Sequence, residues 1–408
     1  MGTDKRFRHA LIALVASLAL AVARSAGAGT SVIPIPEIIT DPNEGNTFGL
    51  LGVVLFTDEK DEIQYMLAPD VRYNDTKGVF PILRFFGYPT PTRRYSLLAG
   101  KSTTKDEDYE FEFADRGLWD GRAFVLADAV YEADSTDRFF GFGNFSNQIR
   151  ESNYTGRNLL IRLTPGVWLL PNLHLSFRTR IHRFEVTDGQ VHNLPFVGAE
   201  FRKEVRDGHG LDTGTYWANR LAFTYDTRDS IDIPSHGAYA VAYSEVADRR
   251  LGSSSSFVKF GVEARDFIPL RKGDPKVKPT LAVRALADYT NGPNKTPFWE
   301  MNSLGGRRAL RGYGSDRFID FNRSLVSAEV RTRVWQRHAF GVNIELELAP
   351  FVEAGKVFEH TAQSPISGMH GVYGIGFRGV VRPQIVGFVD IGRGTEGTSV
   401  FTGVDYPF

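Results

Sequence analysis

The chain has 408 residues, no cysteine and a formal net charge of zero, with 48 basic and 48 acidic side chains. The lack of cysteine excludes disulfides and thiolate metal sites. The balanced charge gives no reason to expect a nucleic-acid partner.

The first 28 residues have the pattern of a secretory signal peptide. It combines a basic region, an apolar core and an A-x-A cleavage site, at Lys5–Arg8, Ala10–Ala23 and Ala26–Ala28. The apolar core is short for a membrane-spanning helix, so we expect cleavage after Ala28 rather than anchoring. The next stretch, 29–45, is rich in proline and turn residues, and we interpret it as a periplasmic lead-in.

From Asn46 to the end the pattern is of one strand after another, with no second domain, so we predict a single barrel over 46–408. The clearest strand is Leu173–Arg183, where apolar residues alternate with polar ones, including His174 and His182, which we interpret as solvated histidines of a lumen. The other candidate strands are Thr47–Thr57, Ile63–Tyr73, Val79–Gly87, Arg94–Lys101, Tyr109–Ala114, Gly121–Ala133, Tyr154–Thr164, Phe196–Val205, Tyr216–Thr227, Gly237–Val246, Phe257–Ile268, Pro279–Asp288, Ser324–Trp335, Val342–Phe358, Val372–Val381, Ile385–Ile391 and Ser399–Tyr406. The raw count is about eighteen.

The stretch Ser303–Arg323 (SLGGRRALRGYGSDRFIDFNR) breaks this pattern. Four of its arginines, Arg307, Arg308, Arg311 and Arg317, fall within eleven positions and are accompanied by four glycines, and the stretch has neither a helical nor a strand period. Glycine at this density predicts a tightly folded loop, because glycine takes left-handed backbone angles at little cost. The strand Ser324–Trp335 follows, with one uncharged and one charged face, as expected between lipid and a water-filled lumen. We predict that the loop folds back into a transmembrane barrel and is anchored there through Arg311.

Three ordered motifs in the second half of the chain resemble a known family. They are LRGY (Leu310–Tyr313), YDTRDSIDIPSHGAY (Tyr225–Tyr239) and the C-terminal pattern that ends at Phe408. Together they resemble the BamA/TamA-type bacterial surface antigen family of outer-membrane barrels. The resemblance implies sixteen strands and an extracellular loop that folds inward. The family normally carries periplasmic POTRA modules before the barrel, and the seventeen residues of 29–45 are too few for one.

The resemblance also implies partners for Arg311. In the family the arginine of the tip lies inside the barrel and meets acidic residues on the two following strands, which by position are Glu329 and Glu353. Strand parity independently directs both carboxylates to the charged face, and one guanidinium can bind two carboxylates. Arg311, Gly312, Tyr313, Glu329 and Glu353 therefore form the predicted structural lock of the loop. The alternative is that they are ordinary solvated charges of the lumen.

The final strand ends in aromatic residues. Val400, Thr402, Val404, Tyr406 and Phe408 share one face, which we expect to point outward. Tyr406 and Phe408 resemble the C-terminal signal that outer-membrane assembly machinery reads. Pro407 cannot donate a ladder hydrogen bond, so pairing at this end of the strand is expected to be weak.

No motif in the sequence indicates catalysis, a cofactor or a metal. A nucleophile elbow (G-x-S-x-G) and an H-E-x-x-H pattern are both absent. The cluster Phe139–Asn144 (FFGFGN) fits either an interfacial girdle or a surface loop, and we favour the girdle. We therefore predict a non-enzymatic, monomeric barrel in the bacterial outer membrane.

By its resemblance, such a barrel would assist protein insertion or export, with a client protein as partner besides membrane lipid and the assembly machinery. The alternative functions are a structural or pore-forming barrel and, less in keeping with the sequence, an enzyme in the barrel wall.

Overall fold

The computed structural model describes residues 29–58, 63–206, 210–211, 213–270, 279–292, 296–339, 342–381, 385–404 and 406. The expected signal peptide, 1–28, and the terminal Phe408 lie outside these residues, and both stay predictions. Within the described ranges, no helix is both long enough and apolar enough to cross a membrane.

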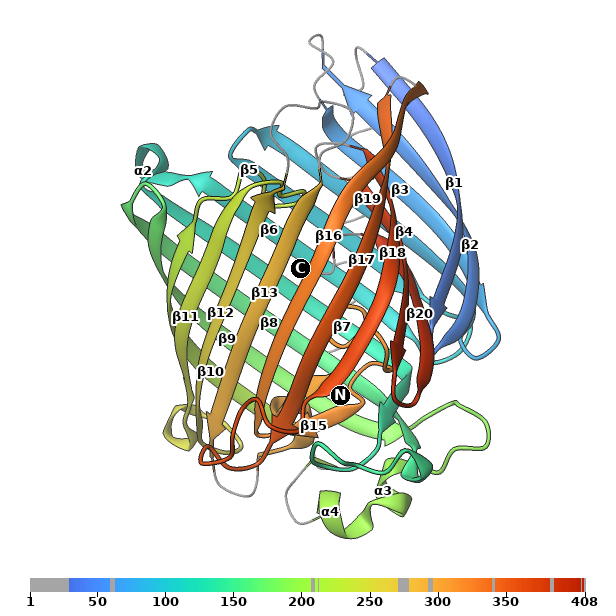
Figure 1. Ribbon diagram of the computed structural model, residues 1–408, viewed down its shortest axis with the longest axis vertical. Helices are drawn as coiled ribbons and strands as arrows, with labels where there is room; N and C mark the ends of the chain where they lie inside the picture. Colours follow the sequence, from blue (N-terminus) through green and yellow to red (C-terminus); the bar gives the residue numbers. More distant parts are fainter. Residues whose placement is uncertain are drawn as a thin grey trace.

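One antiparallel sheet of eighteen strands forms the wall of the molecule (Figure 1). Each wall strand pairs with its neighbours along the chain, so the sheet is a meander that curls into a barrel. The wall strands are β1 (Gly29–Asp41), β2 (Gly45–Thr57), β3 (Ile63–Asn74), β4 (Gly78–Thr90), β5 (Arg93–Lys101), β6 (Glu107–Gly117), β7 (Ala123–Phe139), β8 (Ser152–Leu170), β9 (Leu173–Asp188), β10 (Gly214–Asp226), β11 (Gly237–Ala247), β12 (Phe257–Pro269), β13 (Thr280–Asn291), β16 (Asn322–Ala339), β17 (Val342–Phe358), β18 (His370–Val381), β19 (Ile385–Gly394) and β20 (Gly397–Val404).

The wall corrects two expectations from the sequence. The stretch 29–45, expected to be a lead-in, forms β1, and its Glu37 pairs with Arg72 of β3 at 3.0 Å on the inner face. Prolines are tolerated there because β1 is the first strand, with one edge outside the ladder. Conversely, Phe196–Val205 is not a strand but two short helices, α3 (Val197–Glu200) and α4 (Arg202–Arg206). The two errors cancel in the raw count, and the sixteen strands implied by the resemblance are wrong for this structure.

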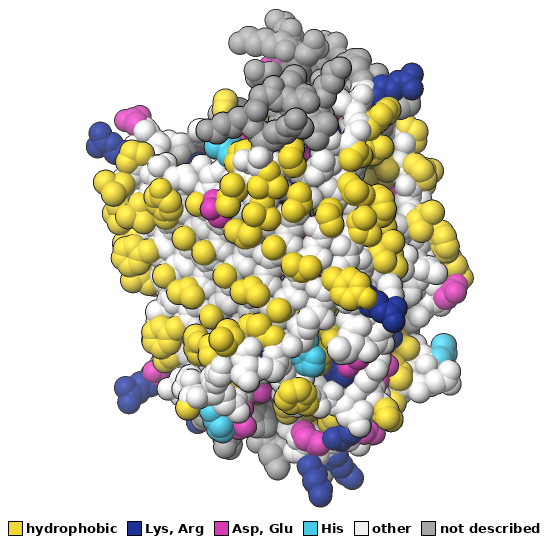
Figure 2. Space-filling view, viewed as in Figure 1, with side chains coloured by type: hydrophobic (Ala, Val, Ile, Leu, Met, Phe, Trp, Pro, Cys, Tyr) yellow, Lys and Arg dark blue, Asp and Glu magenta, His cyan; other side chains and the backbone are white. Residues whose placement is uncertain are grey.

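Side chains alternate between the outer face and the interior, as the two-residue period of a strand requires. In β9, Phe177 and Ile181 are exposed on the outer face, whereas Arg180 and His182 contact groups inside the barrel. His182 is therefore buried and hydrogen-bonded, which corrects its interpretation as a solvated histidine. Figure 2 shows hydrophobic side chains spread over the flank of the barrel and most charged ones toward its two ends, the distribution expected of a membrane-spanning barrel.

The two ends of the barrel differ. The end drawn lower in Figure 1, here named the loop end, carries the long connections, with α3, α4 and the 3-10 helices η1 (Gln148–Arg150), η2 (Arg249–Leu251) and η3 (Phe298–Glu300). The opposite end, here named the turn end, carries the start of β1 and shorter connections, one of which holds α2 (Leu118–Gly121). Long loops at one end and short turns at the other are typical of outer-membrane barrels.

Candidate functional site

The connection between β13 and β16 turns back into the barrel at the loop end, and its described residues 296–321 are named the inward loop. Within it, β14 (Asn302–Leu304) pairs with β15 (Phe318–Asp320) to form a short stem. Gly305, next to the stem, has a φ of +116°, and a Cβ there would lie 2.2 Å from the carbonyl oxygen of Gly314. Only glycine fits at such a position, which explains part of the glycine density seen in the sequence.

Arg311, at the tip of the inward loop, is fully buried among carboxylates (0% exposed). Its Nε donates to Glu353 Oε1 at 3.1 Å and its backbone N–H donates to Glu353 Oε2 at 2.7 Å. Its Nη1 donates to Glu329 Oε2 at 3.1 Å and to Asp390 Oδ2 at 2.9 Å. The guanidinium also stacks 3.6 Å from the ring centroid of Phe351. The structure thus brings together the three charged residues that the sequence singled out and adds Asp390 of β19.

Two more arginines complete this cluster. Arg331 Nε lies 2.6 Å from Glu329 Oε1, and Arg378 of β18 pairs with Asp390. Three guanidiniums therefore face three carboxylates, so the buried charges balance. Asp390 and Arg378 were missed because the resemblance named only the two strands after the loop. The alternation of VDIG in the predicted strand Ile385–Ile391 was the signal that places Asp390 on the inner face.

Gly312 and Tyr313 join the tip to the last hairpin of the wall. A Cβ on Gly312 would lie 2.5 Å from the backbone nitrogen of Gly394, so this contact requires glycine. The Tyr313 hydroxyl lies 2.9 Å from Thr395 Oγ1 and accepts from the Thr395 N–H at 3.1 Å. The tip therefore rests on the turn between β19 and β20. Its function as a lock stays a prediction.

A second anchor, of opposite charge, lies at the start of the inward loop, and no sequence motif indicated it. Glu300 of η3 is buried and accepts from Arg180 Nη2 at 2.7 Å and from Lys259 Nζ at 3.2 Å. Its Oε1 also lies 2.6 Å from His182 Nδ1. Burial opposes the charged form, but Lys259 and Arg180 outweigh it and hold the pKa of Glu300 well below its ordinary value.

The loop end is packed over the inward loop. Phe139, at the end of β7, contacts Phe201, which lies between α3 and α4, with 4.9 Å between the ring centroids. Phe139 also contacts Phe298 of the inward loop. Gly143 donates its N–H to the carbonyl of Ile319 at 2.8 Å. The cluster Phe139–Asn144 is therefore the end of β7 and a loop packed inward, and its interpretation as a girdle was wrong.

The seam between β1 and β20, where the barrel closes, is the second candidate site. No ladder of backbone hydrogen bonds joins the described residues of these two strands. Every other neighbouring pair of wall strands has a backbone register, whereas the described residues of β1 and β20 have none. Thr402 Oγ1 instead bridges them, donating to the Ile38 carbonyl at 2.9 Å and accepting from the Thr40 N–H at 2.9 Å. A side-chain bridge of this kind is weaker than a ladder of backbone bonds.

Tyr406, two residues beyond the end of β20, does not continue the outer face. Its hydroxyl donates to Glu347 Oε2 at 2.6 Å, and Arg331 lies 4.0 Å from its ring centroid, so the side chain points into the barrel. The expectation that Tyr406 points outward was wrong, because buried polar partners inside the barrel satisfy its hydroxyl. Its role in an assembly signal stays a prediction.

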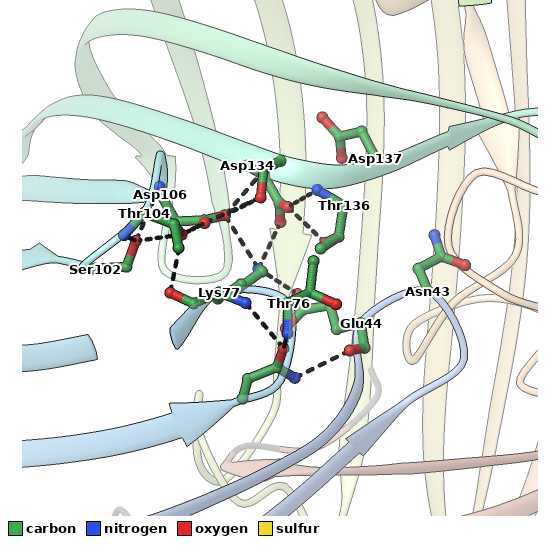
Figure 3. A network of polar contacts seen from close by, with 12 residues as sticks. Asn43, Glu44, Thr76, Lys77, Ser102, Thr104, Asp106, Asp134, Thr136 and Asp137 are labelled. Atoms are coloured by element: carbon green, nitrogen blue, oxygen red, sulfur yellow. Dashed lines mark hydrogen bonds and ion pairs between the residues drawn. The ribbon is translucent and has the colours of Figure 1, made fainter. Parts of the chain in front are cut away.

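The loop end of β1 is clamped by a polar network. Lys77 Nζ lies 3.1 Å from Glu44, in the turn after β1, and 3.1 Å from Asp134 of β7, with Asp106 at 3.8 Å (Figure 3). Burial alone would favour the neutral amine, but the three carboxylates raise the pKa of Lys77 above its usual value. In the same turn, Asn43 Nδ2 donates to the carbonyl of Ser315 in the inward loop at 3.0 Å.

Comparison with known proteins gives three findings. The sequence model described as "Omp85 superfamily domain" matches residues 93–378, well over half of the chain. The outer membrane protein assembly factor BamA of Nitratidesulfovibrio vulgaris is 25% identical over 195 residues, which are 45% of this chain and 22% of that protein. The match therefore spans about a fifth of that relative's length.

Among solved structures, BamA from Haemophilus ducreyi lacking POTRA domains 1–3 has a TM-score of 0.57 at 13% identity, over 91% of this chain and 75% of that one. CdiB from Escherichia coli has a TM-score of 0.51 at 11% identity, over 92% of this chain and 62% of that one. At these identities the likeness concerns the fold alone.

Proposed function

The chain belongs to the Omp85 superfamily, and from this premise we propose that it is an outer-membrane barrel that assists the insertion or export of other proteins through the seam between β1 and β20. The family match confirms the resemblance that LRGY and the two other motifs indicated. The relative from Nitratidesulfovibrio vulgaris is named an outer membrane protein assembly factor, which supports a role of this class.

The observation that carries the proposal is the weakness of the seam. Among the described residues, β1 and β20 are joined by the side chain of Thr402 instead of a backbone ladder. Unpaired backbone at a strand edge is a template for an incoming strand. A seam that opens would offer such edges to a client protein inside the membrane.

The filled interior favours this function over a steadily open pore. The inward loop lies across the lumen with buried anchors at Arg311 and Glu300, and the loop-end connections pack over it. A client strand that enters through the wall does not need this plug to move. The structural or pore-forming barrel remains the alternative function.

The orientation of the barrel suggests where the seam would open. Long loops usually face the cell surface and short turns the periplasm, which assigns the loop end to the surface. Lys77 and Ser315 hold the turn after β1 at that end. Opening would therefore start at the turn end, which faces the periplasm, from which clients arrive.

A disulfide across the seam tests the proposal. Since the chain has no cysteine, Thr40→Cys with Thr402→Cys introduces a single defined pair at the bridged position. Purified protein in lipid vesicles is offered a urea-unfolded outer-membrane barrel, and its insertion is followed by protease protection. We expect the oxidised variant to lose the stimulation of insertion and to regain it after reduction.

The matched control is Ala242→Cys with Val262→Cys, a pair opposite each other on β11 and β12. Cross-linking there leaves the seam free and should leave stimulation unchanged. Equal stimulation by the oxidised and reduced seam variants would show that the seam does not serve insertion, and a steady conductance in planar bilayers would then favour the pore.

A further inference from the structure

A shallow groove crosses the outer face of five neighbouring strands, β11, β12, β13, β16 and β17, which lie side by side in Figure 1. Its floor is a row of small side chains paired from strand to strand, formed by Ala240, Ala264, Ala285, Val326 and Ala354. The next row toward the turn end consists of Ala238, Asp266, Val283, Ala328 and Val352. The groove has a volume of about 630 Å³, which is within the roughly 300–1,000 Å³ of ligand sites.

The groove faces lipid and not the lumen. On β12, Val262 and Ile268 are exposed on the outer face. Ala264 and Asp266 lie between them with the same parity, so they also point outward. Phe267, of opposite parity, is buried. The apolar floor of the groove therefore belongs to the band of the barrel that hydrocarbon covers.

Asp266 is an acidic group on this apolar face. In the described part of the chain, its side chain takes part in no hydrogen bond and no ion pair. The two arginines beside it, Arg265 and Arg284, point to the lumen, where the Nε of each donates to Glu263 Oε1 at 2.7 Å. An unpaired charge is unfavourable on the lipid face of a barrel, and ionisable residues in a membrane usually mark a functional site. The carboxylate therefore favours a cationic partner that approaches from the lipid.

The position of Asp266 fits the head group of a lipid. It is three residues before Pro269, the last residue of β12 at the turn end, which is roughly 10 Å along the strand. The row that contains Ala264 lies on the other side of Asp266, toward the middle of the membrane. An amphiphile in the groove would therefore have its polar end at Asp266 and its apolar chain over Ala264 and Ala285.

We propose that the groove holds one phospholipid whose head group carries a primary ammonium, the class to which phosphatidylethanolamine belongs. The ammonium donates to Asp266 in a charge-assisted hydrogen bond, and an acyl chain lies on the alanine floor. A quaternary ammonium has no N–H to donate, and an anionic head group is repelled by the carboxylate. The site depends on the barrel being embedded in lipid and not on the seam, so it goes beyond the proposed function.

Native mass spectrometry of the detergent-purified protein tests the site. The protein is incubated with an equimolar mixture of phosphatidylethanolamine, phosphatidylcholine and phosphatidylglycerol that have identical acyl chains, and the lipids that stay bound are counted. We expect the wild-type protein to retain phosphatidylethanolamine severalfold more than either other lipid. Asp266→Asn should remove this preference, whereas Asp266→Glu, which keeps the carboxylate, should preserve it.

Ala264→Phe tests the apolar part of the site, because a phenyl ring at this position fills the groove, and it should reduce the binding of all three lipids. One matched control is Ala129→Phe, on the outer face of β7 opposite the exposed Ile161. The other is Glu185→Gln, which removes an exposed carboxylate outside the groove. Both controls should bind lipid as the wild type does. Electrophoretic mobility without heating verifies that each variant is folded.

Equal retention of phosphatidylethanolamine and phosphatidylcholine by the wild type overturns the proposal. A preference that survives in Asp266→Asn, or lipid binding that Ala264→Phe leaves unchanged, overturns it as well. A dimer that Ala264→Phe dissociates would show that the groove joins two copies of the chain and does not hold a lipid. Each of these results leaves the proposed function of the seam standing.

Discussion

Arg311 shows why a buried charge needs several partners. Its guanidinium is removed from solvent and surrounded by Glu353, Glu329 and Asp390. Taking an ion out of water costs several kcal/mol, and only good geometry with further hydrogen bonds offsets that cost. The additional pairs made by Arg331 and Arg378 keep the cluster neutral.

Removing Arg311 should therefore cost more than the loss of one hydrogen bond. Arg311→Ala leaves an excess of buried carboxylates. We therefore expect the free energy of unfolding in lipid vesicles to fall by about 3–5 kcal/mol. Arg311→Lys keeps the charge but loses the planar guanidinium, so its free energy of unfolding should lie between those of the wild type and Arg311→Ala. Urea titration followed by tryptophan fluorescence measures both variants.

Arg393→Ala is the control for these variants, since Arg393 is exposed and its Nη1 donates a hydrogen bond to Thr398 Oγ1 at 3.3 Å. This substitution should change the free energy of unfolding by no more than about 0.5 kcal/mol, as is usual for surface substitutions. If Arg311→Ala is as mild as this control, Arg311 does not lock the loop.

At the scale of elements, the inward loop is fixed at two places by opposite charges. Glu300 is a buried anion among cations near its start, and Arg311 is a buried cation among anions at its tip. The two anchors contact different parts of the wall, on β9 and β12 in one case and on β16, β17 and β19 in the other. The loop is thereby fixed across the barrel and cannot leave by breaking one anchor alone.

The Glu300 anchor should give the barrel an acid-sensitive component of stability. The folded-state pKa of Glu300 lies well below 4.5, the ordinary value that it regains on unfolding. Its contribution is therefore complete above pH 4.5 and is lost as the pH falls below that value toward the folded-state pKa. Denaturation midpoints measured from about pH 7 to about pH 3 should show this loss.

Glu300→Gln should lower stability near neutral pH and flatten the acid dependence, because its amide does not titrate. Glu359→Gln, at an exposed glutamate, is the matched control and should retain the wild-type acid dependence. An unchanged pH profile in Glu300→Gln would show that this anchor does not contribute.

Elements with a regular alternation could be predicted from the sequence, and irregular ones could not. Leu173–Arg183 was recognised because apolar and polar residues alternate without a break. β1 was missed because its prolines are typical of a turn, and only its place at the open edge of the sheet makes them compatible with a strand. Phe196–Val205 was mistaken for a strand because its aromatic residues pack against the inward loop, a tertiary contact that a local pattern does not reveal.

The same distinction applies to the candidate site. Arg311, Glu329 and Glu353 could be predicted, because the LRGY resemblance and strand parity both pointed to them. Glu300 could not, since its partners Arg180 and Lys259 come from strands distant in the sequence and no motif surrounds it. The outward direction of Tyr406 followed from parity, which no longer applies once the chain leaves β20.

At the scale of the whole molecule, β1 is tied firmly to the rest of the barrel at the loop end and only weakly to β20 along the seam. The Lys77 network and the inward loop tie β1 to the wall at the loop end. Along its whole length β1 is paired with β2, but on its seam side the described residues toward the turn end have no backbone ladder. We therefore expect the seam to open by a hinge motion about the loop end while the inward loop stays in place.

The distance across the seam in a membrane tests this account most directly. Spin labels on Ile38→Cys and Val400→Cys report the separation of β1 and β20 by pulsed electron paramagnetic resonance in lipid vesicles. Labels on Leu221→Cys and Ser244→Cys report a paired position on β10 and β11. We predict two populations for the seam pair, one of them longer, and a single narrow population for the control pair. A single narrow population at both positions would contradict the account.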